Sequence, residues 1–310
     1  MARSGSSHSK GTRIPKRMLE AYLKRVGARA DRELDARLPG ASEPPRELHA
    51  AMRYAALGPG KRLRPVLVKL AFDTLGGRSR GVWAAAAAIE MVHAFSLAHD
   101  DLPCMDDDDL RRGRPTLHRR FGEAVALLAG DALLSCAFET LSAAGGPRDS
   151  RARELSVAEL ARATGPRGMI GGQVLDMLAE GRSTTRAKVA EIHRRKTGAL
   201  IRGAVCIGAH WAGASASELR RLAALGETLG LAFQAGDDLL NATSDAKTLG
   251  KAGRSDAARG KATYPRAVGV PGTRRALASL CAEARRQARR LPRRRELWVA
   301  LVDFVESRRS

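Results

Sequence analysis

Aromatic residues and cysteines are both scarce in this chain of 310 residues. Phe, Trp and Tyr together make up 4% of the sequence, and the four cysteines, Cys104, Cys136, Cys206 and Cys281, form no CxxC pair. Cysteines this far apart predict neither a zinc site nor a disulfide scaffold, so we expect buried thiols in a reducing compartment. No window of 18 uncharged apolar residues occurs, which argues against a membrane span and against stable membrane association. We therefore expect a cytoplasmic protein.

Acidic residues are too few to balance the basic ones. The chain has 54 Lys and Arg against 33 Asp and Glu, a formal net charge of +21. Much of this excess lies at the ends, because residues 1–19 hold five basic residues and no acid, and residues 273–310 hold eleven arginines and four acids. A nucleic-acid surface interleaves aromatic side chains for base stacking, and residues 273–310 contain only Trp298 and Phe304. We therefore do not expect nucleic acid to be the main partner.

The N-terminal residues lack the apolar core of a secretory signal. They are rich in serine and free of acids, which leaves a transit-like segment open, but we favour a disordered basic tail over residues 1–15. No linker or repeat divides residues 16–310, and a content of 44% hydrophobic residues is too high for a disordered chain. We expect a single domain across residues 16–310.

Helical patterns dominate the sequence. The alternating β-branched segments typical of strands are missing, and long Ala- and Leu-rich stretches are separated by Pro and Gly. Some of these stretches exceed 20 residues, which is typical of a large helical bundle. The sequence predicts an all-α fold with helices at 16–38, 47–55, 61–75, 82–101, 117–143, 150–164, 168–180, 184–211, 216–241, 273–291 and 294–308.

An acidic run lies at the end of the predicted helix 82–101. Asp100, Asp101 and residues 106–109 place six carboxylates within ten residues, and Arg111 and Arg112 follow. Carboxylates this close repel one another unless a cation neutralises them. Oxygen ligands suit Mg²⁺, which keeps several waters and binds one or two carboxylates together with substrate phosphates, and the paired arginines suit phosphate. On its own, this run is equally compatible with a solvated acidic loop.

A second acidic cluster lies on the predicted helix 216–241. Gln234, Asp237, Asp238 and Asn241 follow the spacing i, i+3, i+4, i+7, so they share one helix face. Two such patches in an apolar bundle can face each other across a cavity and hold several Mg²⁺ ions around one diphosphate. The second cluster therefore favours a metal site over two unrelated acidic loops.

The ordered motifs of this chain resemble those of the trans-isoprenyl diphosphate synthases, and most of all the bacterial members that make farnesyl diphosphate. The resemblance runs from about Met52 to the C-terminus. It rests on Gly60-Lys61-Arg62-Leu63-Arg64-Pro65, Asp100-Asp101 with Asp106, Arg111-Arg112-Gly113, Gly171-Gly172-Gln173 with Asp176, Lys196-Thr197-Gly198, Phe233-Gln234 with Asp237-Asp238, Gly250-Lys251, Asp256, Gly260-Lys261 and Thr263-Tyr264-Pro265. It implies a helical bundle of the isoprenoid synthase type with a central cavity, and a homodimer.

The resemblance also implies the activity, the cofactor and the site residues. Isopentenyl diphosphate would condense head-to-tail with dimethylallyl and geranyl diphosphate in a reaction that depends on three Mg²⁺ ions, with Mn²⁺ as a substitute. Asp100, Asp106 and Asp237 would hold the metal, with Asp101 among the catalytic residues. The allylic diphosphate would be bound by Arg111, Lys196, Thr197, Gln234, Lys251 and Lys261, and isopentenyl diphosphate by Lys61, Arg64, His93 and Arg112. His93 and Asp100 are seven residues apart on one predicted helix, so they share a face.

Product length depends on the floor of the cavity below the first acidic motif. Phe95 lies five residues before Asp100, about 7–8 Å deeper along the helix. In the family a bulky aromatic residue here limits elongation, and its small neighbour Ser96 leaves Phe95 as the residue that would stop the chain at C15. The alternatives are that Phe95 only fills the core, and that the product is geranylgeranyl diphosphate.

One position departs from the family pattern. The second motif usually ends in Asp, and this chain has Asn241 there. Asn keeps an oxygen ligand but removes a charge, so we expect activity with a raised Mg²⁺ requirement. Two further rivals are a class I terpene cyclase, which does not need the element around Lys61, Arg64 and His93, and a basic protein that binds nucleic acid or acts as a scaffold.

Overall fold

Helices make up nearly all the regular structure of the computed structural model, which describes residues 13–243 and 260–307. The α-helices are α1 (Arg13–Asp35), α2 (Arg46–Ala56), α3 (Leu63–Thr74), α4 (Val82–Asp100), α5 (Leu117–Phe121), α6 (Glu123–Ser142), α7 (Ser150–Thr164), α8 (Met169–Ala179), α9 (Arg186–His193), α10 (Ala199–Trp211), α11 (Ala216–Thr243), α13 (Tyr264–Ala288) and α14 (Arg295–Ser307). A 3₁₀ turn, η1 (Pro147–Asp149), and a π-helical segment, η2 (Arg194–Gly198), complete the helical structure of this part of the chain. The fold is all-α, as the sequence predicts.

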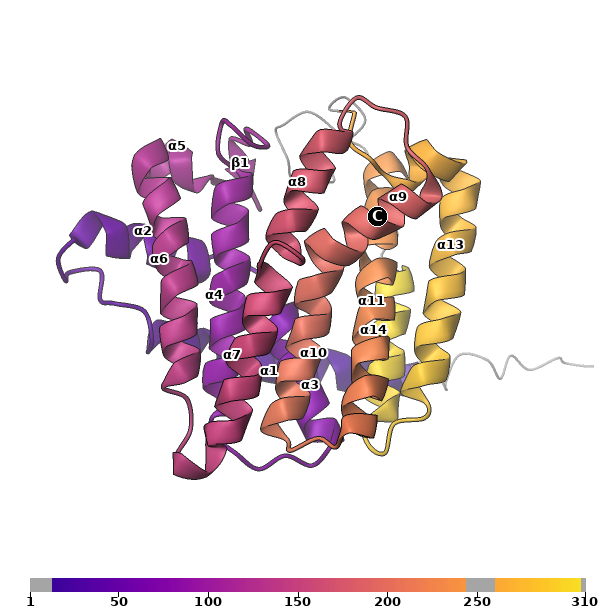
Figure 1. Cartoon of the computed structure of the whole chain (residues 1–310), viewed down its shortest axis with the longest axis horizontal. Helices are drawn as coiled ribbons and strands as arrows, with labels where there is room; N and C mark the ends of the chain where they lie inside the picture. Colours follow the sequence, from indigo (N-terminus) through magenta and orange to yellow (C-terminus); the bar gives the residue numbers. More distant parts are fainter. Residues whose placement is uncertain (1–12, 244–259, 308–310) are drawn as a thin grey trace, which may run out of the picture.

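The alanine-rich helix α4 lies inside the bundle and positions the first acidic motif. Residues 84–88 are five consecutive alanines, all of them buried, and helices with small side chains can be approached closely by their neighbours. Accordingly α4 packs against α6, α3, α1, α10 and α2. Both α4 and α11 end toward the top of Figure 1, so the acidic clusters that they carry lie at the same end of the bundle.

Two long predicted helices are each divided in the structure. The prediction of one helix over 117–143 is wrong because Gly122, with φ of 83°, separates α5 from α6 in a conformation that glycine adopts easily. The predicted helix 184–211 contains η2, a stretch with wider turns, between α9 and α10. Such π-helical turns recur at functional sites.

The segment before residue 273 is also different from the prediction. Helical structure begins at Tyr264, and Gly269, with φ of 69°, kinks α13 just before Pro271. The structure also has a short β-hairpin that the sequence did not reveal. Its two-residue strands are β1 (Leu110–Arg111) and β2 (Arg114–Pro115). Its turn residues Arg112 and Gly113 both have positive φ, which is the geometry of a tight type I′ turn. Arginine is an uncommon residue at such a position, so the turn gave no clear sequence signal.

The expectation of buried thiols is wrong for two of the four cysteines. Only Cys206 and Cys281 are buried, whereas Cys104 is exposed and Cys136 partly exposed. Among the described residues, α4 and α6 are long and apolar enough to cross a membrane, by length and composition alone. The buried share is 72% for α4 and 33% for α6, and core helices of soluble proteins pass the same test. The expected tail over residues 1–15 lies mostly outside the described residues, and α1 begins at Arg13.

Candidate active site

A cavity of about 1250 Å³ lies where α4 and α11 end. Most of the residues singled out from the sequence line it, although they come from segments far apart along the chain. These lining residues are Lys61, Arg64, His93, Phe95, Ser96, Asp100, Asp106, Arg111, Arg112, Lys196, Thr197, Gln234, Asp237, Asn241 and Lys261. Lys251 lies outside the described residues. The cavity brings the two acidic motifs and the basic motifs together.

Asp101 has a different position from its neighbour Asp100. Its side chain is buried, and its two oxygens share the single N–H at Nε of Arg111, at 2.7 Å to Oδ1 and 2.8 Å to Oδ2. Successive residues of a helix point about 100° apart, so Asp100 faces the cavity while Asp101 faces the hairpin. The pKa of Arg111 is raised because the attraction of Asp101 outweighs the cost of burial. Asp101 thus holds the Arg111 guanidinium in place at the cavity wall.

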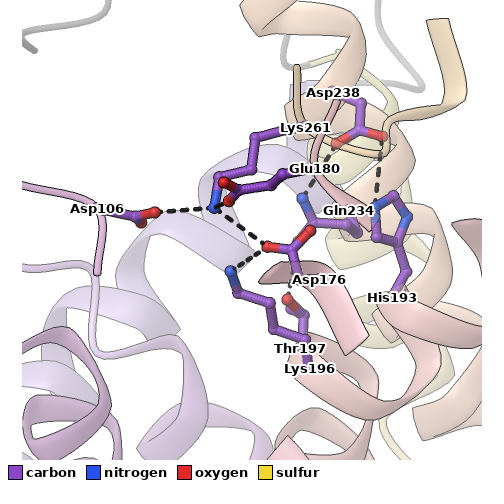
Figure 2. A network of polar contacts seen from close by, with 9 residues as sticks. All are labelled: Asp106, Asp176, Glu180, His193, Lys196, Thr197, Gln234, Asp238 and Lys261. Carbon is purple, nitrogen blue, oxygen red and sulfur yellow. Dashed lines mark hydrogen bonds and ion pairs between the residues drawn. The ribbon is translucent and has the colours of Figure 1, made fainter. Parts of the chain in front are cut away.

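Lysine side chains neutralise the acidic end of the cavity (Figure 2). Lys261 Nζ lies 2.9 Å from Asp106 Oδ1, 2.6 Å from Glu180 Oε1 and 3.5 Å from Asp176 Oδ2. Lys196 Nζ lies 2.7 Å from the same oxygen of Asp176. Burial would lower the pKa of Lys196, but the negative charges around it raise that pKa overall. Both lysines therefore stay charged in the cavity.

The backbone around Lys196 is placed by close approaches at two glycines. A Cβ atom on Gly172 of α8 would lie 2.2 Å from the backbone nitrogen of Lys196, and one on Gly230 of α11 would lie 2.7 Å from Cα of Gly198. Both distances are far inside van der Waals contact, so glycine is required for α8 and α11 to pack this closely on η2. The Gly171-Gly172 motif thus places Lys196 and Thr197 at the cavity wall.

The acidic end has the donors that Mg²⁺ prefers. Burial raises the pKa of Asp100 to about 6; Lys196 opposes this shift and the nearby Asp106 adds to it. A carboxylate in this position gains from a cation. Within residues 13–243 and 260–307, no group of three or more His, Cys, Asp and Glu side chains could hold a metal ion by itself. This arrangement fits Mg²⁺, which takes few protein carboxylates and completes its shell with water and substrate phosphate.

The two aspartates of the second acidic motif both line the cavity, together with Asn241. Asp238 is nevertheless only 2% exposed and is held by hydrogen bonds. Gln234 Nε2 donates to Asp238 Oδ1 at 3.2 Å, and the backbone N–H of Tyr264 donates to Oδ2 at 2.9 Å. The nearest atom of His193, Nε2, lies 3.5 Å from Oδ2 (Figure 2).

The basic end of the cavity is lined by arginines that differ in their pairing. Buried Arg62 forms ion pairs with Asp31 at 2.5 Å and Glu90 at 3.2 Å, and thereby anchors the loop that presents Lys61. Arg64, by contrast, has a buried Nε without a hydrogen-bond partner in the described part of the chain. Burial lowers the pKa of Arg64 to about 10 despite Glu90 nearby. An anion bound here would satisfy this nitrogen.

His93 and Arg112 lie at the same basic end. Burial and four surrounding arginines lower the pKa of His93 well below its usual value, so the ring is neutral, and its buried Nδ1 has no partner among the described residues. Arg112 reaches over the loop to donate to the backbone oxygen of Pro59. A Cβ on Gly60 would lie 2.4 Å from its Nη1, so a larger residue there would displace the end of the Arg112 side chain. These groups form an anion site that is distinct from the lysine-lined acidic end.

Phe95 contributes to the apolar part of the cavity wall, together with side chains of α8 such as Met169 and Val174. Its ring meets the His99 ring edge-on, with 4.8 Å between centroids. His99 is fixed in turn by a contact of 3.0 Å between its Nε2 and the backbone oxygen of Leu127. Phe95 is therefore a part of the cavity wall that is held in place from behind.

Four residues of the site had no role assigned from the sequence. Asp176 and Glu180 balance the two lysines, His193 contacts Asp238, and Gln173 places an amide in the cavity whose two polar atoms have no partner in the described ranges. Asp176 was singled out only as a member of a motif, and its place as the one acid on the apolar helix α8 is a signal for a role in the site. The other three depend on tertiary contacts.

Comparisons with known proteins show the family of this chain. A family model described as polyprenyl synthetase matches residues 45–291. The chain therefore belongs to the polyprenyl synthetase family. Farnesyl diphosphate synthase of Escherichia coli (strain K12) is 45% identical over 295 residues, which cover 94% of this chain and 97% of that protein. Chloroplastic geranylgeranyl pyrophosphate synthase of Capsicum annuum is 41% identical over 267 residues, which cover 85% of this chain and 72% of that protein.

Solved structures share the fold over nearly the whole chain. An apo FPP/GFPP synthase from Zymomonas mobilis gives a TM-score of 0.83 at 33% identity, covering 94% of this chain and 100% of its own. A geranyltransferase from Helicobacter pylori, complexed with magnesium and isoprenyl diphosphate, gives a TM-score of 0.81 at 28% identity and covers 98% of both chains.

Proposed function

We propose that this chain is a farnesyl diphosphate synthase. It condenses isopentenyl diphosphate head-to-tail with dimethylallyl diphosphate and then with geranyl diphosphate, and it releases one diphosphate at each step. The observation that carries the proposal is a single cavity with a carboxylate end neutralised by lysines and a basic end with unsatisfied donors. Such a cavity accommodates two different diphosphates side by side. The similarity to the farnesyl diphosphate synthase of Escherichia coli supports the same product.

Asp100, Asp106 and Asp237 would hold Mg²⁺ at the acidic end. Bound there, Mg²⁺ supplies positive charge that stabilises a diphosphate leaving group. We propose three ions, with Mn²⁺ as a substitute; the magnesium complex of the Helicobacter pylori relative supports the choice of metal. Asn241 provides a neutral oxygen beside this site.

Positively charged side chains bind the allylic diphosphate. Lys196, Lys261 and Arg111 line the acidic end, and Lys251 is proposed to join them. Their charges stabilise the negative charge that develops when the allylic C–O bond breaks. This ionisation leaves an allylic carbocation in a cavity whose apolar wall excludes water.

The basic end positions the second substrate. Lys61, Arg64, His93 and Arg112 bind isopentenyl diphosphate so that its double bond lies next to the carbocation, and such positioning contributes much of the acceleration. The π electrons of that double bond form the new C–C bond, which leaves a positive charge on the other carbon of the former double bond. A carbon next to this new cation then loses a proton to the released diphosphate, and a new double bond results. The protein needs no nucleophile of its own.

Product length follows from Phe95 in the cavity wall, with the smaller Ser96 beside it. We propose that the ring stops elongation at C15. Phe95→Ala should yield C20 and longer products in chromatography, whereas Phe95→Tyr should keep C15. If the Phe95→Ala variant still makes products no longer than C15, the ring only fills the core and does not limit product length. Geranylgeranyl diphosphate synthase is the second candidate, favoured by the similarity to the Capsicum annuum protein.

The proposed activity is tested by incubating the purified chain with isopentenyl and dimethylallyl diphosphates and Mg²⁺. We expect farnesyl diphosphate, and no product when EDTA is present. Absence of any prenyl diphosphate above C5 would overturn the proposal. Salt-sensitive retention of DNA or RNA without prenyl transfer would favour a basic binding protein instead.

We propose further that the domain spans residues 16–310, and that the protein is a cytoplasmic homodimer without stable membrane association. Leu127 and Leu128 on α6 are 45% and 57% exposed, and covering such a face by a second copy removes apolar surface from water. Light scattering should give twice the chain mass, and Leu128→Glu should give the monomer. Flotation with phospholipid vesicles would contradict the proposed lack of membrane association.

A further inference from the structure

Asp238 lies at the centre of a hydrogen-bond chain that leads to the cavity wall (Figure 2). Its two oxygens accept from Gln234 Nε2 at 3.2 Å and from the backbone N–H of Tyr264 at 2.9 Å. Gln234 in turn accepts a hydrogen bond of 2.8 Å from the hydroxyl of Thr197 through its Oε1. Three elements, α11, the start of α13 and η2, are thereby joined through one carboxylate.

The direction of these hydrogen bonds follows from the chemistry of the groups. A carboxylate can only accept, so Gln234 must turn its NH₂ group toward Asp238. The amide oxygen then faces Thr197, and the Thr197 hydroxyl must use its single proton to donate to that oxygen. The lone pairs of the hydroxyl oxygen are left for the cavity, which Thr197 lines.

The backbone N–H of Tyr264 holds the Asp238 carboxylate in its position beside Gln234. It can only donate, and it occupies Oδ2 of a side chain that is 2% exposed. Burial also leaves little space for water to replace either partner. The amide of Gln234 would otherwise be free to turn by 180°, since its two ends have nearly the same shape.

We propose that Asp238 is a positioning residue that sets the direction in which the Thr197 hydroxyl points. The hydroxyl then turns the lone pairs of its oxygen toward the allylic carbocation. This inference rests on the proposed function. In this proposal the second aspartate of the motif orients the Gln234 amide and the Thr197 hydroxyl, whereas Asp237 faces the diphosphate. A reversed amide would let the hydroxyl proton point at the cation and raise the barrier.

The test is a double-mutant cycle of Asp238→Asn with Thr197→Val, measured as kcat, both KM values, the half-saturating Mg²⁺ concentration and the melting temperature. Asparagine can donate to Gln234 Oε1, so the amide is free to reverse. We expect Asp238→Asn to lower kcat by about 10–100-fold, with both KM values and the Mg²⁺ requirement within about threefold of the parent. Thr197→Ser keeps the hydroxyl and should keep most of the activity.

The decisive comparison is Asp238→Asn in the Thr197→Val background. With no hydroxyl left to orient, the second substitution should change kcat by less than about threefold. A loss of equal size in both backgrounds would overturn the proposal and indicate a purely structural role. A tenfold rise in the Mg²⁺ requirement, with kcat restored at high Mg²⁺, would overturn it in favour of a metal ligand.

Two controls separate this result from other failures. Glu154→Gln removes an exposed ion pair with Arg151 on α7 and should leave every value unchanged. If the parent chain makes no prenyl diphosphate at all, the proposed function fails. If the parent is active but the cycle shows no coupling, only the role of Asp238 fails.

Discussion

The two ends of the cavity solve opposite electrostatic problems. At the acidic end, lysines form ion pairs with carboxylates. Lys196 and Lys261 both contact Asp176, so these groups neutralise one another without a ligand. At the basic end, Arg62 is paired, but Arg64 and His93 keep buried atoms without partners in the described part of the chain. The acidic end is therefore stable when empty, whereas the basic end is completed by its ligand. Residues at the first end should contribute to both folding and catalysis, and those at the second mainly to binding.

The largest expected effect is the loss of a carboxylate that faces the leaving group. Asp100→Asn should lower kcat by about 10³-fold or more, because charge stabilisation at the diphosphate is lost. Asp107→Asn is the matched control, since Asp107 belongs to the same acidic run but is exposed and adopts a positive φ that Asn tolerates. Steady-state kinetics with saturating Mg²⁺ would check this. Equal losses in both variants would show that the run acts only through its total charge.

The next effect concerns folding at the acidic end. Asp176→Asn leaves Lys196 and Lys261 without their shared carboxylate, so the ligand-free protein should lose about 2–4 kcal/mol of unfolding free energy. Glu154→Gln, which breaks an exposed pair, should cost no more than about 0.5 kcal/mol. Urea denaturation measures both. If the two variants cost the same, the acidic end is not stabilised by internal pairing.

Substitution at the basic end should weaken substrate binding and leave the unfolding free energy nearly unchanged. Arg64→Met keeps the length of the side chain but removes its charge, and KM for isopentenyl diphosphate should rise by about 10–100-fold. The unfolding free energy should stay the same or increase slightly, because a partly unsatisfied charge leaves the protein interior. A clear loss of stability would show that Arg64 also has a structural role and would remove the contrast between the ends.

The smallest effect is a pH dependence of stability that both ends share for different reasons. Burial lowers the pKa of His193 to about 4, although Asp176 opposes the shift; burial and arginine charges lower that of His93. Each ring takes up a proton more easily when unfolded, so stability falls as pH decreases from about 6.5 toward 4. His193 should contribute about 2 kcal/mol to this fall. Asp100, with its pKa raised to about 6, contributes with the opposite sign.

Urea titrations of ligand-free protein between pH 7.5 and pH 4.5 would measure this dependence. His193→Gln should flatten the fall by its own share, and His93→Gln should do so at the other end of the cavity. The comparison between variants and parent cancels the contribution of Asp100. An unchanged slope in His193→Gln would contradict the prediction.

The helices were predictable because they depend on local patterns. Apolar stretches between Gly and Pro located α7 at the observed residues and most other helices within a few residues. The errors have different causes. The break at Gly122 depends on a positive φ, and α13 begins after the capping residue Thr263, so both are local features that helical periodicity does not show. The π-helical turn before Ala199 lies where Gly172 and Gly230 allow α8 and α11 to approach closely, and no local pattern records such a contact.

The candidate site was predictable as a set of residues but not as a set of contacts. The i, i+3, i+4, i+7 spacing of the second motif indicates one shared face, and Asp237 and Asp238 do both line the cavity. The spacing does not show that Asp238 is buried and accepts a hydrogen bond from the backbone of Tyr264. Likewise Asp100 faces the cavity and Asp101 holds Arg111. In each pair two adjacent aspartates have the same sequence signal, and only their neighbours in space distinguish them.

The sequence by itself determined the all-α fold, the two acidic motifs, the basic motifs and the motif order typical of the family, since each of these depends on residue type and local spacing. Tertiary structure alone decided which charges pair. Asp176 meets Lys196 and Lys261 across 20 and 85 residues of chain, and Asp238 meets Tyr264 across 26. Hydrogen bonds and ion pairs act over a few ångströms, so chain folding had to bring these groups together before any of them could act on its partner.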